Sequence, residues 1–194
     1  MTVATEKMNS AEDRTTLYGF WLYLMTDFML FASLFAVFIV LRGPAFGGSS
    51  VVFFDMKLVL AETLILLSSS FTCGLFLLAA RAGHDRSVIT WMYVTILLGL
   101  AFLGIELSEF RTLLLEGNGP ASSGFFSAFF TLVGTHGLHI AVGLIWMIAL
   151  AAAIVQDGLT NAHMRKLMLL GMFWHFLDIV WIFIFSIVYL IGTV

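Results

Sequence analysis

The sequence of 194 residues is 61% hydrophobic and only 11% charged, with a mean hydropathy of +1.04. A soluble domain of this length has no core large enough to bury so much apolar surface, so the composition excludes an ordinary soluble protein and indicates several membrane spans. The net charge of −3 and the lack of a basic run exclude nucleic acid as an expected partner, and the single cysteine, Cys73, excludes an internal disulfide and any cysteine-ligated zinc or iron–sulfur site.

The chain begins with sixteen polar residues that lack the apolar core of a signal peptide, so we expect residues 1–17 to form an N-terminal tail. A bilayer core about 30 Å thick takes about 20 residues of helix. We therefore predict that residues 18–194 form one all-α integral membrane domain, a bundle of five transmembrane helices over residues 18–41, 56–80, 88–110, 125–155 and 167–191.

Lys and Arg residues are divided unequally between the two ends of these spans. One side holds six (Lys7, Arg14, Arg81, Arg86, Arg165 and Lys166) and the other holds three (Arg42, Lys57 and Arg111). Cytoplasmic loops carry the excess of positive charge. We therefore expect a cytoplasmic N-terminus and a C-terminus on the outer side of the membrane.

Ionisable residues interrupt the apolar spans. An ionised side chain at the bilayer centre costs about 2.5–3.5 kcal/mol on insertion scales, so such groups are expected to face protein or water. Glu106 and Glu109 approach the outer end of the third span. The groups deeper in the membrane, taken in chain order, are Asp27, Glu62, His136, His139, His175 and Asp178.

The fourth span is the longest, and its 31 predicted residues exceed what the hydrocarbon layer needs, so we expect it to tilt or project. Residues three apart share a helix face, which places His136 beside His139 and His175 beside Asp178. With Asp27 at a similar depth, the first, fourth and fifth spans are predicted to meet through these groups. Gly137 and Ala141 would allow another helix to approach the same region closely.

Small polar and aromatic residues are expected to support this packing. Four hydroxyl residues in the second span are interpreted as interhelical hydrogen-bonders: Ser68, Ser69, Ser70 and Thr72. Aromatic residues near the span ends are interpreted as membrane-interface anchors: Trp21, Tyr23, Trp91, Tyr93, Trp146, Trp174 and Tyr189.

The two central histidines of the fourth span allow more than one interpretation. The spacing differs from the H-E-x-x-H of zinc proteases. His136 and His175 could instead ligate a haem between two helices, and Asp27, Glu62 and Asp178 could carry protons in a transporter. A structural polar network remains the favoured reading, with no catalytic, cofactor-binding or metal-binding residue in the chain.

Three stretches of the sequence resemble subunit III of the haem–copper terminal oxidases. The first is GFWLYLMTDFMLFASLF, in which Asp27 stands where the cytochrome c oxidases commonly have Glu. The second is GNGPASSGFFSAFFTLVGTHGLHIAVGLIWM, the histidine-bearing helix. The third is FWHFLDIVWIFIFSIVYLIG, which fills the pattern W-H-F-x-D-x-x-W with Trp174, His175, Phe176, Asp178 and Trp181.

The resemblance is greatest to the cytochrome o ubiquinol oxidases, and it implies a non-catalytic accessory subunit of a proton-pumping complex that oxidises ubiquinol and reduces dioxygen. The alternative within the family is the five-helix subunit III of a bacterial cytochrome c oxidase, since mitochondrial-type subunits have seven helices. The resemblance also implies contact with subunit I, which would hold the haems and copper, and with subunits II and IV. Bound phospholipid and a location in the bacterial inner membrane, with a periplasmic C-terminus, are further implications.

Overall fold

All regular structure in residues 2–43 and 56–190, which the computed structural model describes with side chains from residue 14 onward, is helical. The elements are α1 (Thr2–Leu41), α2 (Met56–Arg81), α3 (Asp85–Leu115), α4 (Gly124–Asp157), α5 (Asn161–Ile184) and the π-helical η2 (Phe185–Leu190). Five spans within the described residues are long and apolar enough to cross a membrane, with η2 completing the fifth. The prediction of an all-α, five-span membrane protein is thus confirmed.

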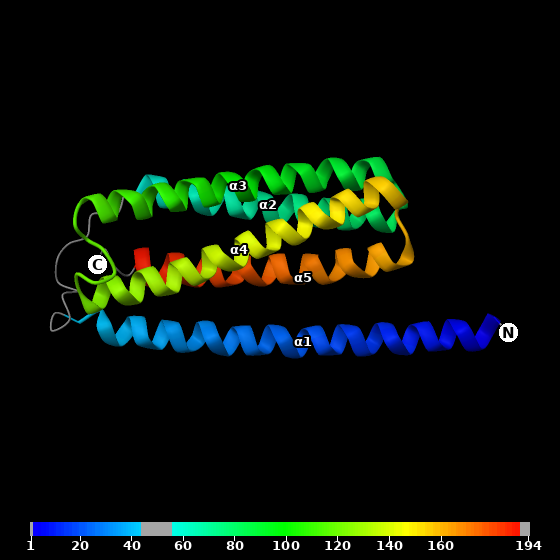
Figure 1. Ribbon diagram of the computed structural model, residues 1–194, viewed down its shortest axis with the longest axis horizontal. Coiled ribbons are helices and arrows are strands. Elements are labelled where there is room, and N and C mark those ends of the chain that lie inside the picture. The colour runs from blue at the N-terminus through cyan, green and yellow to red at the C-terminus, as the bar shows by residue number, and fades with distance from the viewer. Residues whose placement is uncertain (1, 44–55, 191–194) are drawn as a thin grey trace.

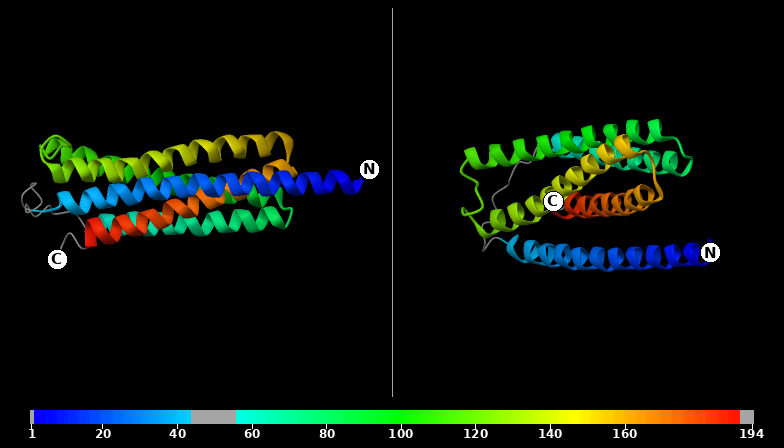
Figure 2. Two further views of the ribbon diagram at one scale, coloured as in Figure 1. Left: turned by 90° about the horizontal axis from the view of Figure 1, so that it is seen from below. Right: turned by 45° about the vertical axis from the view of Figure 1, so that its right-hand side comes forward.

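The helices lie side by side along one long axis (Figure 1). α2 and α3 form an antiparallel pair, α4 packs on α3 and α5, and α1 packs on α4 and α5 at the edge of the bundle. Figure 2 shows α1 lying along α4 and α5 from a second direction. α1 begins and η2 ends at opposite ends of the bundle, as an odd number of spans requires (Figure 1).

The helices extend beyond the predicted spans. α3 runs over residues 85–115 instead of 88–110, and α5 begins at Asn161 instead of residue 167. α1 begins at Thr2, so the backbone of the predicted polar tail continues the first helix past the end of the bundle (Figure 1). Hydropathy identifies only the part of a helix that lies in hydrocarbon, whereas backbone hydrogen bonds continue through polar residues beyond it.

The helix ends in the connections follow local capping chemistry. Ser123 and Thr160 precede α4 and α5, and each side-chain oxygen accepts a hydrogen bond from the backbone N–H three residues later, at 3.2 Å. Gly158 ends α4 with φ of 74°, a conformation that side chains disfavour. These caps make the α4–α5 connection a turn of three residues.

α4 crosses α5 obliquely (Figure 1), whereas the tilt of the fourth span relative to a bilayer stays a prediction. α4 has 34 residues, and at 1.5 Å per residue it is about 51 Å long. Glycines allow the crossing. A Cβ on Gly143 would stand 3.1 Å from ring atoms of Phe173 and Trp174, so α4 and α5 approach closely there.

Trp174 and Tyr189 lie in the interior of the bundle, and their interpretation as interface anchors is wrong. Both side chains are fully buried, and each donates a hydrogen bond inside the protein, Trp174 to Ser69 and Tyr189 to Glu109. A buried indole or phenol needs such a partner. By contrast, Trp21 is half exposed, as an anchor would be.

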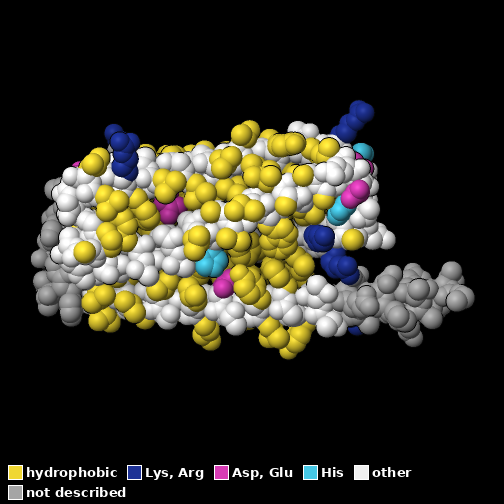
Figure 3. Space-filling view, in the orientation of Figure 1, with side chains coloured by type: hydrophobic (Ala, Val, Ile, Leu, Met, Phe, Trp, Pro, Cys, Tyr) yellow, Lys and Arg dark blue, Asp and Glu magenta, His cyan; other side chains and the backbone are white. Residues whose placement is uncertain are grey.

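The outer surface of the bundle is apolar. On the face in Figure 3 hydrophobic side chains cover the centre, and Lys and Arg side chains lie towards the two ends. Many large hydrophobic residues are more than 40% exposed, among them Phe71, Leu138 and Ile145. So large an apolar surface is unfavourable in water and favourable in contact with lipid.

Candidate functional site

The buried polar residues of the described chain form separate groups instead of one network. The sequence predicted that Asp27, His136, His139 and Asp178 meet between α1, α4 and α5. Only Asp27 and His139 come together in this way, and Asp178 lies beside His175 and Ser70 at the contact of α5 with α2. The expectation of a single meeting point is therefore corrected.

Asp27 and His139 link α1 to α4 near the middle of the membrane. The Asp27 Oδ2 and His139 Nε2 atoms are 3.7 Å apart. His139 Nδ1–H donates to the Thr135 carbonyl oxygen at 2.7 Å, because a carbonyl can only accept. This carboxyl–imidazole contact therefore joins α1 to α4.

His136 points into the centre of the bundle and not towards Asp27. Its ring is fully buried, stacks on Trp181 with a centroid distance of 5.3 Å and meets Phe102 edge-on at 6.0 Å. Neither ring nitrogen has a hydrogen-bond partner within the described chain. Positions three apart on a helix differ by about 60° around its axis. That angle separates His136 from His139 although both belong to one broad face.

His175 and Asp178 share a face of α5, as the spacing predicted. His175 Nδ1 lies 2.7 Å from the Ser70 Oγ atom of α2 and 3.8 Å from Asp178 Oδ2. Asp178 is buried, and neither of its oxygens has a hydrogen-bond partner among the residues that the structure describes. The group therefore joins α2 to α5 through the imidazole.

Two further bonds run between the same two helices. The indole N–H groups of Trp174 and Trp181 donate to the hydroxyl oxygens of Ser69 and Thr63, both at 3.1 Å. Thr72 bonds to Thr95 of α3 at 2.8 Å. The prediction of interhelical hydrogen bonds is confirmed for Ser69, Ser70 and Thr72. It is wrong for Ser68, whose hydroxyl donates to the Leu64 carbonyl of its own helix.

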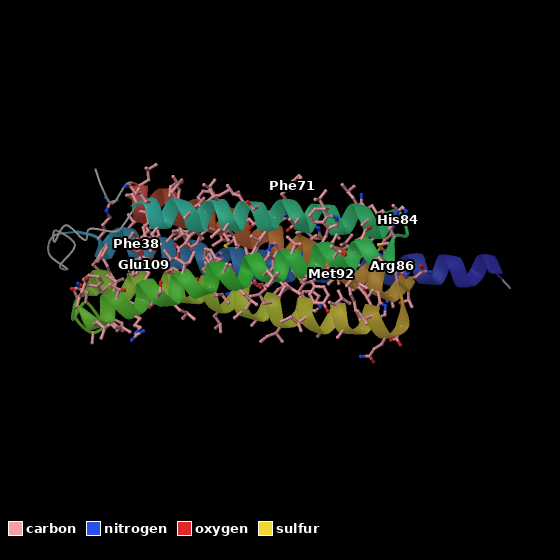
Figure 4. All side chains as sticks on the ribbon, turned by 90° about the horizontal axis from the view of Figure 1, so that it is seen from above. Phe38, Phe71, His84, Arg86, Met92 and Glu109 are labelled. Carbon is pink, nitrogen blue, oxygen red and sulfur yellow. The ribbon has the colours of Figure 1, made fainter. Side chains whose placement is uncertain are left out.

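A cluster of carboxyl side chains lies in the half of the bundle that contains η2, the last element of the described chain. Glu62 of α2 interacts electrostatically with Glu106 and Glu109 of α3, and Tyr189 of η2 donates a hydrogen bond to Glu109 Oε2 at 3.2 Å. All four residues are buried, and neither oxygen of Glu62 has a described hydrogen-bond partner. Figure 4 shows Glu109 near the same end of the bundle as Phe38, opposite His84 and Arg86.

Sequence reasoning did not bring this cluster together. Hydropathy placed Glu106 and Glu109 near a span end, and Tyr189 was interpreted as an anchor. The three-residue spacing of Glu106 and Glu109 was the available signal, since it puts both carboxyls on one helix face. Which neighbour this face meets depends on helix rotation, which the sequence pattern does not give.

Gly137 provides space for a side chain and not for a helix backbone. A Cβ at this position would stand 2.5 Å from Glu106 Oε1, so the carboxyl of α3 lies directly against the α4 backbone. Ala141 is partly exposed. The predicted close packing at Gly137 and Ala141 therefore takes a different form, in which Gly137 accommodates Glu106.

No set of three or more His, Cys, Asp or Glu side chains in the described residues is arranged to hold a metal ion. The two histidines weighed as haem ligands also have different surroundings. His136 is enclosed by aromatic rings, whereas the His175 side chain is 44% exposed. In this geometry the polar groups connect α1 with α4, α2 with α5, and α2 with α3.

Comparison with known proteins gives one consistent pattern. A family model described as cytochrome c oxidase subunit III matches residues 5–193. The chain is 53% identical to "Cytochrome bo(3) ubiquinol oxidase subunit 3" of Pseudomonas aeruginosa over 92% of the chain and 86% of that protein. It is 46% identical to the protein of the same name from Buchnera aphidicola, covering 92% of each chain, and 40% identical to "Quinol oxidase subunit 3" of Bacillus spizizenii, covering 97% and 93%.

Proposed function

The chain belongs to the cytochrome c oxidase subunit III family, and from this membership we propose that it is the non-catalytic subunit III of a proton-pumping ubiquinol oxidase. The similarity to proteins named quinol oxidase subunit 3, which extends over nine tenths of the chain, is the observation that carries the proposal. The alternative electron donor is cytochrome c. The description of the family names it, whereas the names of these relatives do not.

The proposed role of the buried polar groups is to hold the helices in register. Hydrogen bonds between side chains of α2 and α5 satisfy polar atoms that lipid would leave unsolvated. The contact of Asp27 with His139 brings two further polar groups together inside the protein. A rigid bundle of this kind offers a constant surface to a larger neighbour. Glu62 and its carboxyl neighbours would add to the packing of α2 against α3.

The proposed complex supplies what this chain does not. Subunit I would hold the haems and copper and form the main contact, with subunits II and IV as further partners and membrane lipid around the exposed helices. The redox groups, when bound in subunit I, reduce dioxygen. The N-terminus would lie in the cytoplasm and the protein in the bacterial inner membrane, in keeping with the Lys and Arg distribution.

Affinity purification of the tagged chain in mild detergent tests this proposal. We expect larger subunits and a haem spectrum to co-purify, and the assembly to consume oxygen with ubiquinol but not with reduced cytochrome c. Oxidation of cytochrome c alone would favour the other branch of the family.

Two results would contradict the subunit assignment. Stoichiometric haem retained by the isolated chain and lost on replacement of His136 or His175 would identify a stand-alone redox protein. Solute uptake by vesicles containing only this chain, abolished by replacing Asp27, Glu62 or Asp178, would identify a transporter.

A further inference from the structure

A long apolar groove runs between α1 and α5 on the outside of the bundle. It has a volume of about 730 Å³ and extends along α1 from Trp21 to Ile39 and along α5 and η2 from Met172 to Ile187. Eighteen residues of helix correspond to about 27 Å, so the groove follows most of the depth of the hydrocarbon layer. Its volume lies within the range of about 300–1,000 Å³ that is typical of small-molecule sites.

His175 is the ionisable side chain that lines this groove, and it lies near the middle of the 30-residue fifth span. Its Nδ1 atom is fixed from behind by Ser70, with Asp178 close by. Its Nε2 atom makes no hydrogen bond to any side chain or backbone group of the described residues. The His175 side chain is 44% exposed and lines the groove, so the second ring nitrogen lies in a region where lipid offers no hydrogen-bond partner. This is unfavourable unless an occupant supplies one.

These features define the occupant. It must be apolar over most of its length, and it must carry one hydrogen-bonding group near the bilayer midplane. A phospholipid meets the first condition only, because its polar groups lie about 15 Å away at the interface, at half the thickness of the hydrocarbon layer. A transmembrane helix, about 10–12 Å across, would lie over the groove, and only its side chains would enter the groove.

We propose that the α1–α5 groove binds an isoprenoid quinone, with its head group on His175 Nε2 and its tail along the groove. The flat ring would pack against the aromatic walls formed by Phe28, Phe31 and Phe176, and the branched tail would occupy the apolar remainder. The choice of quinone among amphiphiles rests on the proposed function, since ubiquinol is the substrate of that complex.

The Ser70 contact allows the site to accept both redox forms. A hydroxyl can donate to or accept from Nδ1, so either neutral tautomer of His175 is accommodated. With the proton on Nδ1, the Nε2 lone pair accepts a hydrogen bond from a quinol hydroxyl. With the proton on Nε2, the imidazole donates to a quinone carbonyl. The site binds without any redox step and holds quinone in the accessory subunit.

Photolabelling of the intact complex tests the proposal. The purified complex is placed in nanodiscs of phosphatidylethanolamine and irradiated with an azido-ubiquinone, and the labelled peptides are identified by mass spectrometry. We expect label on α1 and α5 that excess ubiquinone displaces. Ala32→Trp, which fills the groove, and His175→Leu should each lower this labelling at least tenfold. Ile145→Trp on the exposed face of α4 is the matched control and should leave it unchanged.

The His175→Leu variant loses the hydrogen bond to Ser70, and this loss could prevent assembly of the complex. The Ala32→Trp variant leaves His175 in place, so it keeps the test decisive in that case. Labelling of α1 and α5 that neither variant lowers, or that phospholipid displaces as well as quinone, would overturn the proposal. Labelling seen only after removal of the other subunits would show that a partner helix covers the groove and would overturn it equally. A complex that oxidises ubiquinol but shows no such label refutes this inference and leaves the proposed function standing, whereas a complex inactive with ubiquinol refutes the function.

Discussion

Asp27 and His139 face each other across α1 and α4, with 3.7 Å between carboxylate and imidazole. The His139 ring is held by Thr135 on one side and packs against Phe31 on the other, at a centroid distance of 5.2 Å. Because α1 is the least buried of the five spans, this contact adds to a small set of buried α1 side chains, Leu24, Phe31 and Phe38. Asp27 acts as a helix-positioning residue in this interpretation.

Replacing Asp27 by Ala should slow oxygen consumption by a few-fold at most and lower the yield of complex, because the pair contributes on the scale of interhelical polar contacts, about 0.6 and at most about 1.7 kcal/mol. Oxygen uptake and native-gel yield measure both effects. Ser33→Ala on α1 is the control, since that hydroxyl bonds only to the Leu30 carbonyl of its own helix. A fully assembled Asp27→Ala complex without oxygen reduction would instead make Asp27 an essential proton carrier.

Gly137→Ala should destabilise the bundle by about 1–3 kcal/mol, the usual cost of overpacking. The added methyl group would stand 2.5 Å from Glu106 Oε1, in a place where α3 and α4 leave no room. Thermal unfolding of the purified complex measures the loss. Gly104→Ala is a matched control because a Cβ there would meet nothing within 4 Å. If Glu106→Ala does not relieve part of the cost in the double variant, the proposed clash is refuted.

At the scale of helices, α2 and α5 are joined by side-chain hydrogen bonds at successive levels. Trp181 bonds to Thr63, Trp174 to Ser69 and His175 to Ser70. The three donor or acceptor pairs follow the line where the two helices touch. They set the rotation of α5, which places His175 at the groove and directs Trp181 towards His136.

Removing the three hydroxyls of α2 together, as Thr63→Val, Ser69→Ala and Ser70→Ala, should lower stability by about 2 kcal/mol if each bond contributes about 0.6 kcal/mol. The measurement is the denaturation midpoint of the purified complex in graded detergent or heat. Ser68→Ala serves as the control, because this hydroxyl bonds to its own backbone. Equal effects of the control and the triple variant would show that these bonds do not stabilise the helix pair.

At the scale of the whole molecule, the five spans of the described residues put the start of α1 and the end of η2 at opposite ends of the bundle. The α2–α3 and α4–α5 connections lie at one end of the bundle, and the α3–α4 connection lies at the other (Figure 1). The Lys and Arg excess predicts that the first of these ends faces the cytoplasm.

Cysteine labelling checks this orientation. In a Cys73→Ala background, Asn118→Cys in the α3–α4 connection should react with a membrane-impermeant maleimide in intact spheroplasts. His84→Cys in the α2–α3 connection should react only after the membrane is opened. Cys73 itself is buried, so its replacement removes background and no exposed group. The opposite pattern would invert the assigned topology.

The sequence by itself determined the number of spans, their approximate positions and the family, because hydrocarbon thickness fixes span length and long motifs such as FWHFLDIVW are local features of the chain. It also identified Asp27 and His139 as groups that would face protein, since isolated charges avoid lipid. The sequence did not determine the rotation of each helix about its own axis. Spacing by three placed His136 beside His139, and a difference of about 60° was enough to direct one ring into the core and the other to α1. The tertiary structure alone assembled Glu62, Glu106, Glu109 and Tyr189, and it alone opened the groove at His175. Both depend on which faces of neighbouring helices meet, a matter of side-chain fit between segments far apart in the chain.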